Sequence, residues 1–182
     1  MQKIIDSALT LEEALRGATN VPKEIRDTLT LLDIEYVSFD GMLHQGQLVV
    51  HQEIARELKE IFEALRDLKF PIMKAVPIVE YNWLDEPSMA DNNTSAFNYR
   101  LVYATNELSN HSYGLAVDIN PAINPYMAID GTIFPSGAVY DPTKPGTLLI
   151  GDRVVELFES KGWEWGGKWK GKKDWQHFQK VK

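Results

Sequence analysis

The sequence predicts an α+β fold in a single domain that spans residues 1–182. Three observations support this class: a turn signal between two strand-like stretches, a helical periodicity directly after them, and short strand-like segments in the C-terminal half. A chain of 182 residues is about one ordinary domain and is long enough to bury a sizeable core. We therefore expect the helices and strands to pack within one domain.

Residues 1–30 are expected to form an N-terminal helical extension. Thr10 and Glu13 make a capping box ahead of an apolar segment, and a glycine follows that segment as a stop signal. These features predict a short helix over residues 11–16, and Pro22 is suited to open a second one.

The next segment combines a hairpin with a long helix. Residues 31–50 are interpreted as two or three short strands with a turn at Asp40-Gly41. In residues 51–70 the apolar side chains recur at helical spacing, which predicts an amphipathic helix packed on the core. The apolar stripe of this helix consists of Ile54, Leu58, Ile61, Phe62, Leu65 and Leu68.

Shorter patterns predict the elements in the middle of the chain. Residues 73–80 suggest a strand, which Pro77 would place at a sheet edge or a bulge. Residues 81–100 are rich in turn-forming residues and are expected to be a long loop. A further strand is expected over residues 114–120.

The C-terminal third is punctuated by proline and glycine. We expect a loop insertion over residues 122–148 and a helix over residues 151–162. The aromatic tail that follows should form strand segments around a turn at Gly166 and Gly167. The tryptophans of this tail are expected to divide between the core and a substrate groove. They are Trp163, Trp165, Trp169 and Trp175.

Composition excludes several classes of function. The formal net charge is -7, with 26 acidic and 19 basic residues, which argues against a nucleic-acid partner. The one basic cluster, KWKGKKDW at residues 168–175, is too short to reverse that balance. No apolar run approaches the roughly 20 residues that a membrane-spanning helix needs. The lack of cysteine excludes disulfides, a thiolate zinc site and a cysteine nucleophile.

The N-terminal segment does not contain the apolar stretch of a signal peptide. We therefore expect either cytoplasmic synthesis, as for a phage-type protein, or a periplasmic or extracytoplasmic protein whose leader has been removed. The sequence leaves the oligomeric state open.

The most specific chemical signal lies in residues 107–121. His111 precedes a turn at Tyr113-Gly114, and Asp118 lies in the strand that follows, so the chain can aim both side chains at one point. One imidazole and one carboxylate are two possible zinc ligands. A catalytic zinc takes three protein ligands and keeps a fourth position for water, so a third ligand is needed.

The remaining histidines are the candidates for that third ligand. His44 lies in the hairpin and His51 at the start of the long helix, where structural roles are the more common ones. His177 lies in the segment DWQHFQ, three residues after Asp174. A carboxylate beside a zinc-bound water is what metal-assisted hydrolysis requires, because it accepts the proton as the water attacks. Each of these residues alone is weak evidence, since a single histidine or aspartate is more often structural.

Two motifs together resemble a known family. The pattern S-x-H-x-x-G-x-A-x-D is formed by Ser109, His111, Gly114, Ala116 and Asp118, and the pattern D-W-x-H ends at His177. This combination resembles the zinc D-alanyl-D-alanine carboxypeptidases of VanY type, a family that also holds phage L-alanyl-D-glutamate endopeptidases. The motif-bearing residues span roughly 95–178, and the long helix is also similar to one that precedes the site in relatives. The resemblance thus covers most of the chain, although residues 1–30 and 122–148 carry no motif of the family.

The resemblance implies a fold and a metal site. The fold would place the zinc site on a small antiparallel sheet flanked by helices, as in the hedgehog/DD-peptidase group. His111, Asp118 and His177 would bind one Zn²⁺ per chain, and Asp174 would be the general base. Many members carry glutamate in place of this aspartate, while the endopeptidase-like members also use aspartate.

The resemblance also implies roles for two further residues. Ser109 would help to hold the substrate near the metal. Arg100 would polarise the scissile carbonyl and stabilise the oxyanion that develops from it. An arginine at this place could equally be a structural ion-pair partner.

The implied activity is hydrolysis of the stem peptides of bacterial peptidoglycan, either as a carboxypeptidase or as an endopeptidase. Two alternatives stay open: a non-catalytic zinc-containing binding module of hedgehog-like fold, and a peptidase for other small peptides. The presence of a base at Asp174 favours an enzyme. Terminal or internal cleavage would depend on how residues 82–98 and 122–148 shape the pocket.

Overall fold

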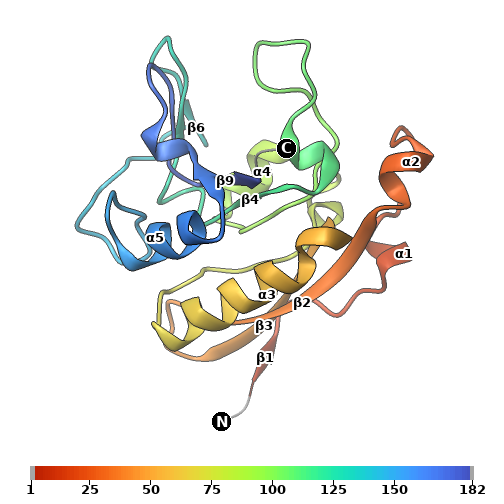
Figure 1. Ribbon diagram of the computed structural model, residues 1–182, viewed down its shortest axis with the longest axis horizontal. Coiled ribbons are helices and arrows are strands. Elements are labelled where there is room, and N and C mark those ends of the chain that lie inside the picture. Colours follow the sequence, from red (N-terminus) through yellow and green to blue (C-terminus); the bar gives the residue numbers. More distant parts are fainter. Residues whose placement is uncertain (1–2, 181–182) are drawn as a thin grey trace.

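A computed structural model describes residues 3–180 and combines helices with three separate three-stranded sheets (Figure 1). The strand orders of the sheets are β1-β3-β2, β4-β9-β7 and β6-β5-β8. This arrangement confirms the expected α+β class. Among residues 3–180, no helix combines the length and apolar character needed to cross a bilayer.

The N-terminal residues contain both expected helices, together with a strand. Helix α1 (Leu11–Ala14) begins with the predicted capping box, and α2 (Lys23–Arg26) begins directly after Pro22. Strand β1 (Ile4–Ile5) pairs in parallel with β3. The extension is therefore not purely helical, because β1 adds a third strand to the sheet that follows.

The predicted hairpin is confirmed, with longer strands than expected. Strand β2 (Leu29–Val37) and strand β3 (Leu43–His51) pair antiparallel over nine residues each. The connecting turn contains Asp40 and Gly41, and Gly41 has a φ of +77°, a conformation that glycine adopts without strain. Uninterrupted pairing merges the two or three short strands of the prediction into two long ones.

Helix α3 (Gln52–Asp67) is the predicted amphipathic helix. Five of its six stripe residues are buried, namely Ile54, Leu58, Ile61, Phe62 and Leu65. Leu68 is the exception and is 40% exposed, because the helix ends at Asp67 and Leu68 is its C-terminal cap.

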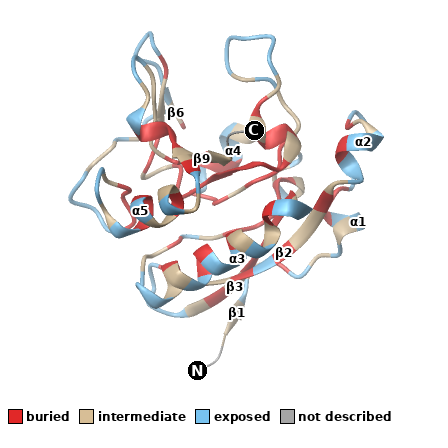
Figure 2. Cartoon of the chain, viewed as in Figure 1, coloured by how far each residue is buried: buried red, intermediate tan, exposed pale blue. Residues whose placement is uncertain are grey.

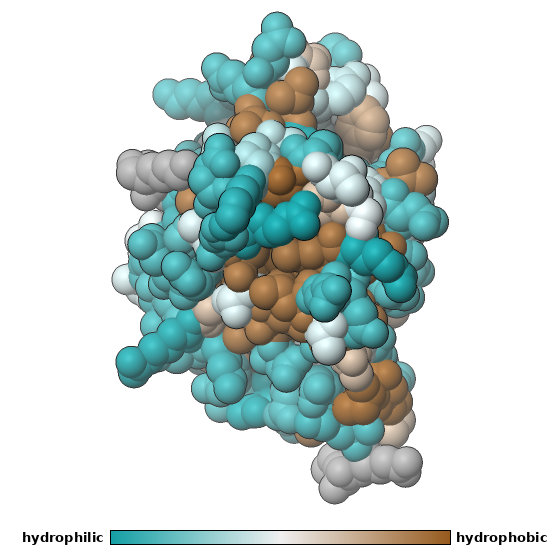
Figure 3. All heavy atoms as spheres, turned by 90° about the vertical axis from the view of Figure 1, so that its right-hand side faces the viewer, coloured by the Kyte–Doolittle hydropathy of each residue, from teal (hydrophilic) through white to brown (hydrophobic). Residues whose placement is uncertain are grey.

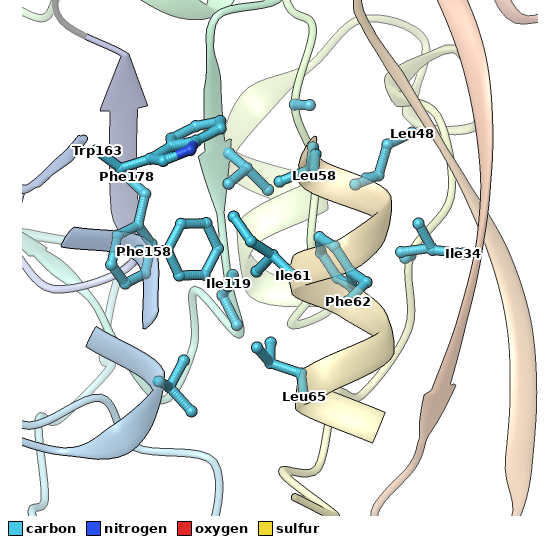
Figure 4. Close-up of a cluster of buried hydrophobic side chains, with 14 of the residues drawn as sticks. Ile34, Leu48, Leu58, Ile61, Phe62, Leu65, Ile119, Phe158, Trp163 and Phe178 are labelled. Carbon is cyan, nitrogen blue, oxygen red and sulfur yellow. The ribbon is translucent and has the colours of Figure 1, made fainter. Parts of the chain in front are cut away.

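The main core lies on both sides of α3 (Figure 4). Ile34 and Leu48 reach it from the hairpin on one side, and Phe178 and Phe158 from the other (Figure 4). Phe178 belongs to β9 (His177–Lys180), which pairs with β4 (Ala116–Asp118) and β7 (Trp163–Trp165). Helix α3 thus joins the long hairpin to the small sheet that contains the family motifs.

Helix α5 (Arg153–Ser160) confirms the helix expected over residues 151–162. The Asp152 side chain caps its start by accepting a hydrogen bond of 2.7 Å from the backbone N–H of Val155. Phe158 of this helix stacks on Phe178 with ring centroids 3.9 Å apart. The helix therefore packs against the small sheet next to α3, and Lys161 at its end pairs with Glu60 of α3 at 3.1 Å.

Two predictions for residues 73–100 are wrong. Residues 73–80 form no strand: they make one isolated bridge, between Lys74 and Asn93, and then enter the 3₁₀ helix η1 (Ile78–Tyr81) after Pro77. The expected loop contains helix α4 (Asp85–Ala90). Three of the turn-forming residues of this segment, Asp85, Pro87 and Ser88, lie within this helix.

Residues 122–148 are more than a loop insertion. They contain strands β5 (Tyr126–Met127) and β6 (Ile133–Phe134), which pair antiparallel. Strand β5 also pairs with β8 (Lys173–Asp174) in the C-terminal tail. The segment therefore supports the strand on which Asp174 lies.

A second apolar cluster lies beneath α1 and α2 and includes Val21, Ile25, Leu29 and Phe97. Figure 3 shows this side of the molecule, where hydrophobic side chains gather near the centre of the face and hydrophilic ones surround them. This cluster fastens the N-terminal helices to the end of the hairpin.

His44 is buried and lies in a polar network that is distant in sequence from residues 107–121 and from His177. Its Nδ1 lies 2.9 Å from Oδ2 of Asp6, its Nε2 lies 3.1 Å from Oδ2 of Asp40, and Tyr36 donates a hydrogen bond to Asp6. Burial alone would lower the pKa of His44, but the hydrogen bonds and charges of Asp6 and Asp40 outweigh it and raise the pKa. His44 therefore joins the N-terminal strand to the hairpin.

This network should make stability depend on pH. Because the pKa of His44 is raised in the folded protein, its contribution to the free energy of unfolding is full below the unfolded value of about 6.5. The contribution is lost as pH rises through the folded pKa. Urea unfolding of the wild-type and His44→Gln proteins should show a larger difference at pH 6 than at pH 9. A difference that is the same at both pH values would contradict this prediction.

Candidate metal centre

Three side chains from separate parts of the motif region converge in a buried cluster. His111 Nε2 lies 3.0 Å from His177 Nδ1 and 3.1 Å from Asp118 Oδ2, and His177 Nδ1 lies 2.9 Å from Asp118 Oδ1. All three residues are buried, and their potential ligand atoms lie within 4.8 Å of one another. Two imidazole nitrogens and a carboxylate at this spacing have the composition of a three-residue metal site.

The backbone explains this convergence. Asp118 on β4 stands directly opposite His177 on β9 in the antiparallel register. The neighbouring residues Ile119 and Gln176 share a backbone hydrogen bond of 2.9 Å, so Asp118 and His177 form the pair whose side chains come closer. Strand β4 and residues 119–121, which follow it, are buried (Figure 2).

His111 reaches the cluster from a short turn before β4. It lies in the 3₁₀ helix η2 (Asn110–Tyr113), whose N-cap is Ser109 and whose C-cap is Gly114 with a φ of +66°. A Cβ at position 114 would lie 2.6 Å from the backbone nitrogen of His51. Only glycine fits there, so the glycine of the motif fixes His111 against the start of α3.

The outer nitrogen of each imidazole faces an acceptor. His111 Nδ1 contacts the backbone carbonyl of Ala96, and His177 Nε2 lies 3.0 Å from Oε1 of Gln179. The orientation of the Gln179 amide is fixed because its Nε2 donates to Glu164 at 2.8 Å. With a metal bound, each histidine would keep its proton on the outer nitrogen, beside this acceptor, and both inner nitrogens would face the metal.

Electrostatics favour a charged carboxylate at the centre of the cluster. Burial alone would raise the pKa of Asp118, but the charge of His111 and the hydrogen bonds of both histidines lower it well below its usual range. Burial alone would lower the pKa of His177, but the hydrogen bond and charge of Asp118 outweigh it and raise the pKa to about 9, so a bound metal would have to displace the inner proton. Once that proton is displaced, an ionised aspartate and two neutral imidazoles match the nitrogen and oxygen ligands that zinc accepts. The residues present therefore fit a divalent metal such as zinc.

Gln179 should control how tightly a metal is held. Replacing Gln179 by leucine removes the acceptor that orients His177, and loss of such an outer partner typically lowers metal affinity about 10- to 100-fold. Competition with a zinc chelator should reveal this loss while the thermal midpoint of the metal-free protein changes little. Equal zinc affinity in the Gln179→Leu and wild-type proteins would remove Gln179 from the centre.

Asp174 is a second acidic residue, beside the cluster. It lies on β8 opposite Tyr126, and its Oδ1 is buried without a hydrogen-bond partner. Burial raises the pKa of Asp174 to about 6; the charge of Asp118 adds to this effect, while that of His177 opposes it. An unpartnered carboxylate oxygen with a raised pKa is suited to accept a proton.

Gly166 permits the position of Asp174. A Cβ at residue 166 would lie 2.6 Å from the backbone oxygen and 2.7 Å from the Cβ of Asp174. The 3₁₀ helix η3 (Gly166–Lys168) can therefore lie directly against β8. The glycine pair was expected to form a turn, and Gly166 also makes room for the acidic residue.

The cluster opens into a cavity of about 430 Å³. Asp174, Ser109 and Arg100 line it together with the three clustered residues. Ser109 also has a structural role, because its Oγ accepts a hydrogen bond of 3.3 Å from the backbone N–H of His111. Arg100 lies beside Asp85 of α4, with 3.1 Å between Nε and Oδ2, in an ion pair that does not have the alignment of a hydrogen bond.

Most of the other candidate residues lie outside the cavity. His44 belongs to the network with Asp6, and His51 caps α3 by accepting from the backbone N–H of Glu53 at 3.3 Å. The tryptophans divide: Trp163 and Trp165 are in the core, whereas Trp169 lines the cavity. Trp175 packs on the main core and stacks on Tyr140 at 4.2 Å.

Several cavity residues were missed in the sequence. Asp85 and Met89 come from α4, and Tyr126 comes from the segment interpreted as a loop. Gln179 carried a usable signal, because it lies two residues after His177 and so shares its face of the strand. Asp85 and Tyr126 carried no such signal in the sequence, because only contacts between distant segments bring them to the site.

Comparison with known protein families gives a match to the region that contains the cluster. Residues 103–180 match the family model described as D-alanyl-D-alanine carboxypeptidase. The match includes the three clustered residues and Asp174, and it begins after Arg100. Searches of curated proteins and of solved structures gave no significant match.

Proposed function

We propose, from the match of residues 103–180 and the buried donor set, that the chain is a zinc peptidase that hydrolyses bacterial peptidoglycan stem peptides. The observation that carries the proposal is the cluster of His111, Asp118 and His177 beside the unpartnered carboxylate of Asp174. A non-catalytic zinc-binding module would need only the three metal ligands and no acidic group beside them. The buried acidic group beside them supports an enzyme.

The residues can share the work of hydrolysis in a simple way. Zinc held by His111, Asp118 and His177 would lower the pKa of a bound water toward about 7 and polarise the scissile carbonyl. Asp174 would take the proton from the attacking water and return it to the leaving amine. The burial that raises the pKa of Asp174 to about 6 strengthens it as a proton acceptor.

Arg100 is the residue proposed to stabilise the oxyanion. Its charge lowers the pKa of Asp174, so it acts within the same electrostatic environment. The ion pair with Asp85 ties Arg100 to α4, which holds the guanidinium at the cavity wall. Ser109 also lies at this wall and is proposed to contact the substrate.

Two substitutions separate catalysis by Arg100 from a structural role. Arg100→Ala should lower turnover about 100-fold or more, the scale for loss of an oxyanion donor, without changing zinc content or thermal midpoint. Asp85→Asn breaks the same ion pair but keeps the guanidinium, so turnover should fall much less. A purely structural role would instead lower the thermal midpoint of both variants and leave turnover per folded molecule unchanged.

The proposed function is tested by product analysis on defined peptides. The zinc-loaded protein is incubated with peptidoglycan stem peptides, with the corresponding dipeptides and with unrelated peptides, and products are identified by mass spectrometry. Release of D-alanine would identify a carboxypeptidase, and cleavage between L-alanine and D-glutamate an endopeptidase. If the protein cleaves only the unrelated peptides, peptidoglycan is excluded as its substrate. Zinc binding with no cleavage of any peptide would favour the non-catalytic module.

A further inference from the structure

The basic segment near the C-terminus borders the cavity. Of its lysines, Lys168 pairs with Glu159 at 2.5 Å, and Lys173 donates to the carbonyl of Gly167 at 3.1 Å. Lys172 lines the cavity instead. In a chain of net charge -7, this segment places positive charge at the candidate site.

Lys172 differs from the other cation of the cavity. Arg100 is paired with Asp85, but among the described lysines and arginines that line the cavity, Lys172 alone has no carboxylate partner. The cavity wall also contains the carboxylates of Asp85, Glu107, Asp118 and Asp174. An anionic ligand would be repelled by these groups unless a local cation opposed them.

The aromatic ring of Trp169 connects Lys172 to the metal centre. Lys172 Nζ lies 4.7 Å from the centroid of the Trp169 ring, and that ring lies 5.4 Å from the ring of His177. Trp169 is itself held by a hydrogen bond of 2.6 Å from its Nε1 to Glu164. The ammonium group thus rests on a fixed surface one ring away from a proposed zinc ligand.

We propose that Lys172 is the anchor for a free carboxylate of the substrate, a role that rests on the proposed peptidase function. Consecutive Cα atoms are about 3.8 Å apart. A carboxylate on the residue next to the scissile bond therefore lies about one residue length from the carbonyl group that the metal would hold. The ammonium group binds this carboxylate while the Trp169 ring limits its freedom. The carboxylate is either the C-terminal group of the peptide or that of an acidic residue beside the scissile bond.

Paired acid and amide peptides test the anchor. The first pair is N-acetylated L-lysyl-D-alanyl-D-alanine and its C-terminal amide; the second contains L-alanyl-D-glutamate or L-alanyl-D-glutamine, with both C-termini amidated. Lys172→Met should raise KM for an acid form about 10- to 100-fold, the range for loss of a hydrogen bond to a charged group, with kcat changed far less. Amide forms should be unaffected, and Lys172→Arg should restore much of the loss.

The matched control is Lys170→Met, which removes a lysine from the same segment but outside the cavity. An effect on the first pair identifies the C-terminal carboxylate, and an effect on the second identifies the acidic residue. The proposal is overturned if Lys172→Met behaves like Lys170→Met on both pairs, or weakens acid and amide forms equally.

Binding separates failure of the anchor from failure of the proposed function. Calorimetric titration of the same peptides into zinc-loaded Asp174→Asn protein needs no turnover. Tighter binding of an acid form, lost in the Asp174→Asn/Lys172→Met double variant, supports the anchor even if the wild-type protein cleaves none of these peptides. Equal binding of acid and amide forms, or no binding of either, overturns it.

Discussion

The His177→Ala variant should lose its zinc and, with it, nearly all peptide hydrolysis. His177 supplies one of the three donors that converge within 4.8 Å, so its removal leaves two donors for a metal that takes three protein ligands in catalytic sites. Zinc affinity should fall by more than the roughly 100-fold that loss of an outer partner can cost. Turnover should fall with zinc occupancy.

Metal analysis after dialysis measures this loss directly, and thermal unfolding gives an independent reading. Zinc that binds only the folded state should raise the midpoint of the wild-type protein and leave that of His177→Ala unchanged. His51→Ala is the matched control, because it removes a histidine that caps α3 outside the cavity. That control should keep its zinc even if its midpoint falls slightly. Stoichiometric zinc in the His177→Ala protein would exclude His177 as a ligand.

The Asp174→Asn variant should keep its zinc and lose most of its turnover. Asparagine preserves the size of the side chain but cannot accept a proton at neutral pH, and general base catalysis typically contributes about 10²- to 10⁴-fold. Stability should not fall, because the carboxylate oxygen Oδ1 has no hydrogen-bond partner that the substitution would remove.

Single-turnover kinetics and zinc analysis on one preparation test this prediction. Asp130→Asn serves as the control, since Asp130 is an exposed residue in the turn of the β5–β6 hairpin and does not line the cavity. The control should retain full turnover. If the Asp174→Asn protein were as active as the control, the proton would have to be accepted elsewhere.

Local patterns were sufficient for the long elements. Helix α3 follows from apolar spacing, and the hairpin from its turn residues, because both signals lie within a few residues of one another. For the helix, the prediction failed at its end, where Leu68 continues the spacing but acts as the cap. Periodicity does not mark where a helix stops.

Short elements held by long-range contacts could not be predicted. Strands β5, β6 and β8 have two residues each, too few for an alternating pattern, and β5 meets β8 across more than 40 residues of sequence. Helix α4 begins without a side-chain cap. It also contains Pro87 in its first turn, where proline is tolerated, although in the sequence a proline indicates a loop. Tertiary pairing, rather than propensity, decides these segments.

The candidate site was more predictable than its surroundings. The structure brings together His111, Asp118 and His177, the residues that the two motifs indicated, although their role as zinc ligands stays a prediction. The motifs did not indicate the groups that orient these side chains. The carbonyl of Ala96 reaches His111 through contacts that no spacing rule expresses, whereas the amide of Gln179 reaches His177 from two residues along the same strand.

The proposed proton acceptor and the proposed metal ligands lie on different secondary-structure elements. The ligands are carried by η2, β4 and β9, whereas Asp174 is carried by β8 and held in place by the hairpin of β5 and β6. We therefore expect substitutions in that hairpin to alter the turnover of the proposed peptidase more than its metal binding. Exchanging the hairpin between relatives would be a way to retune turnover without rebuilding the zinc site.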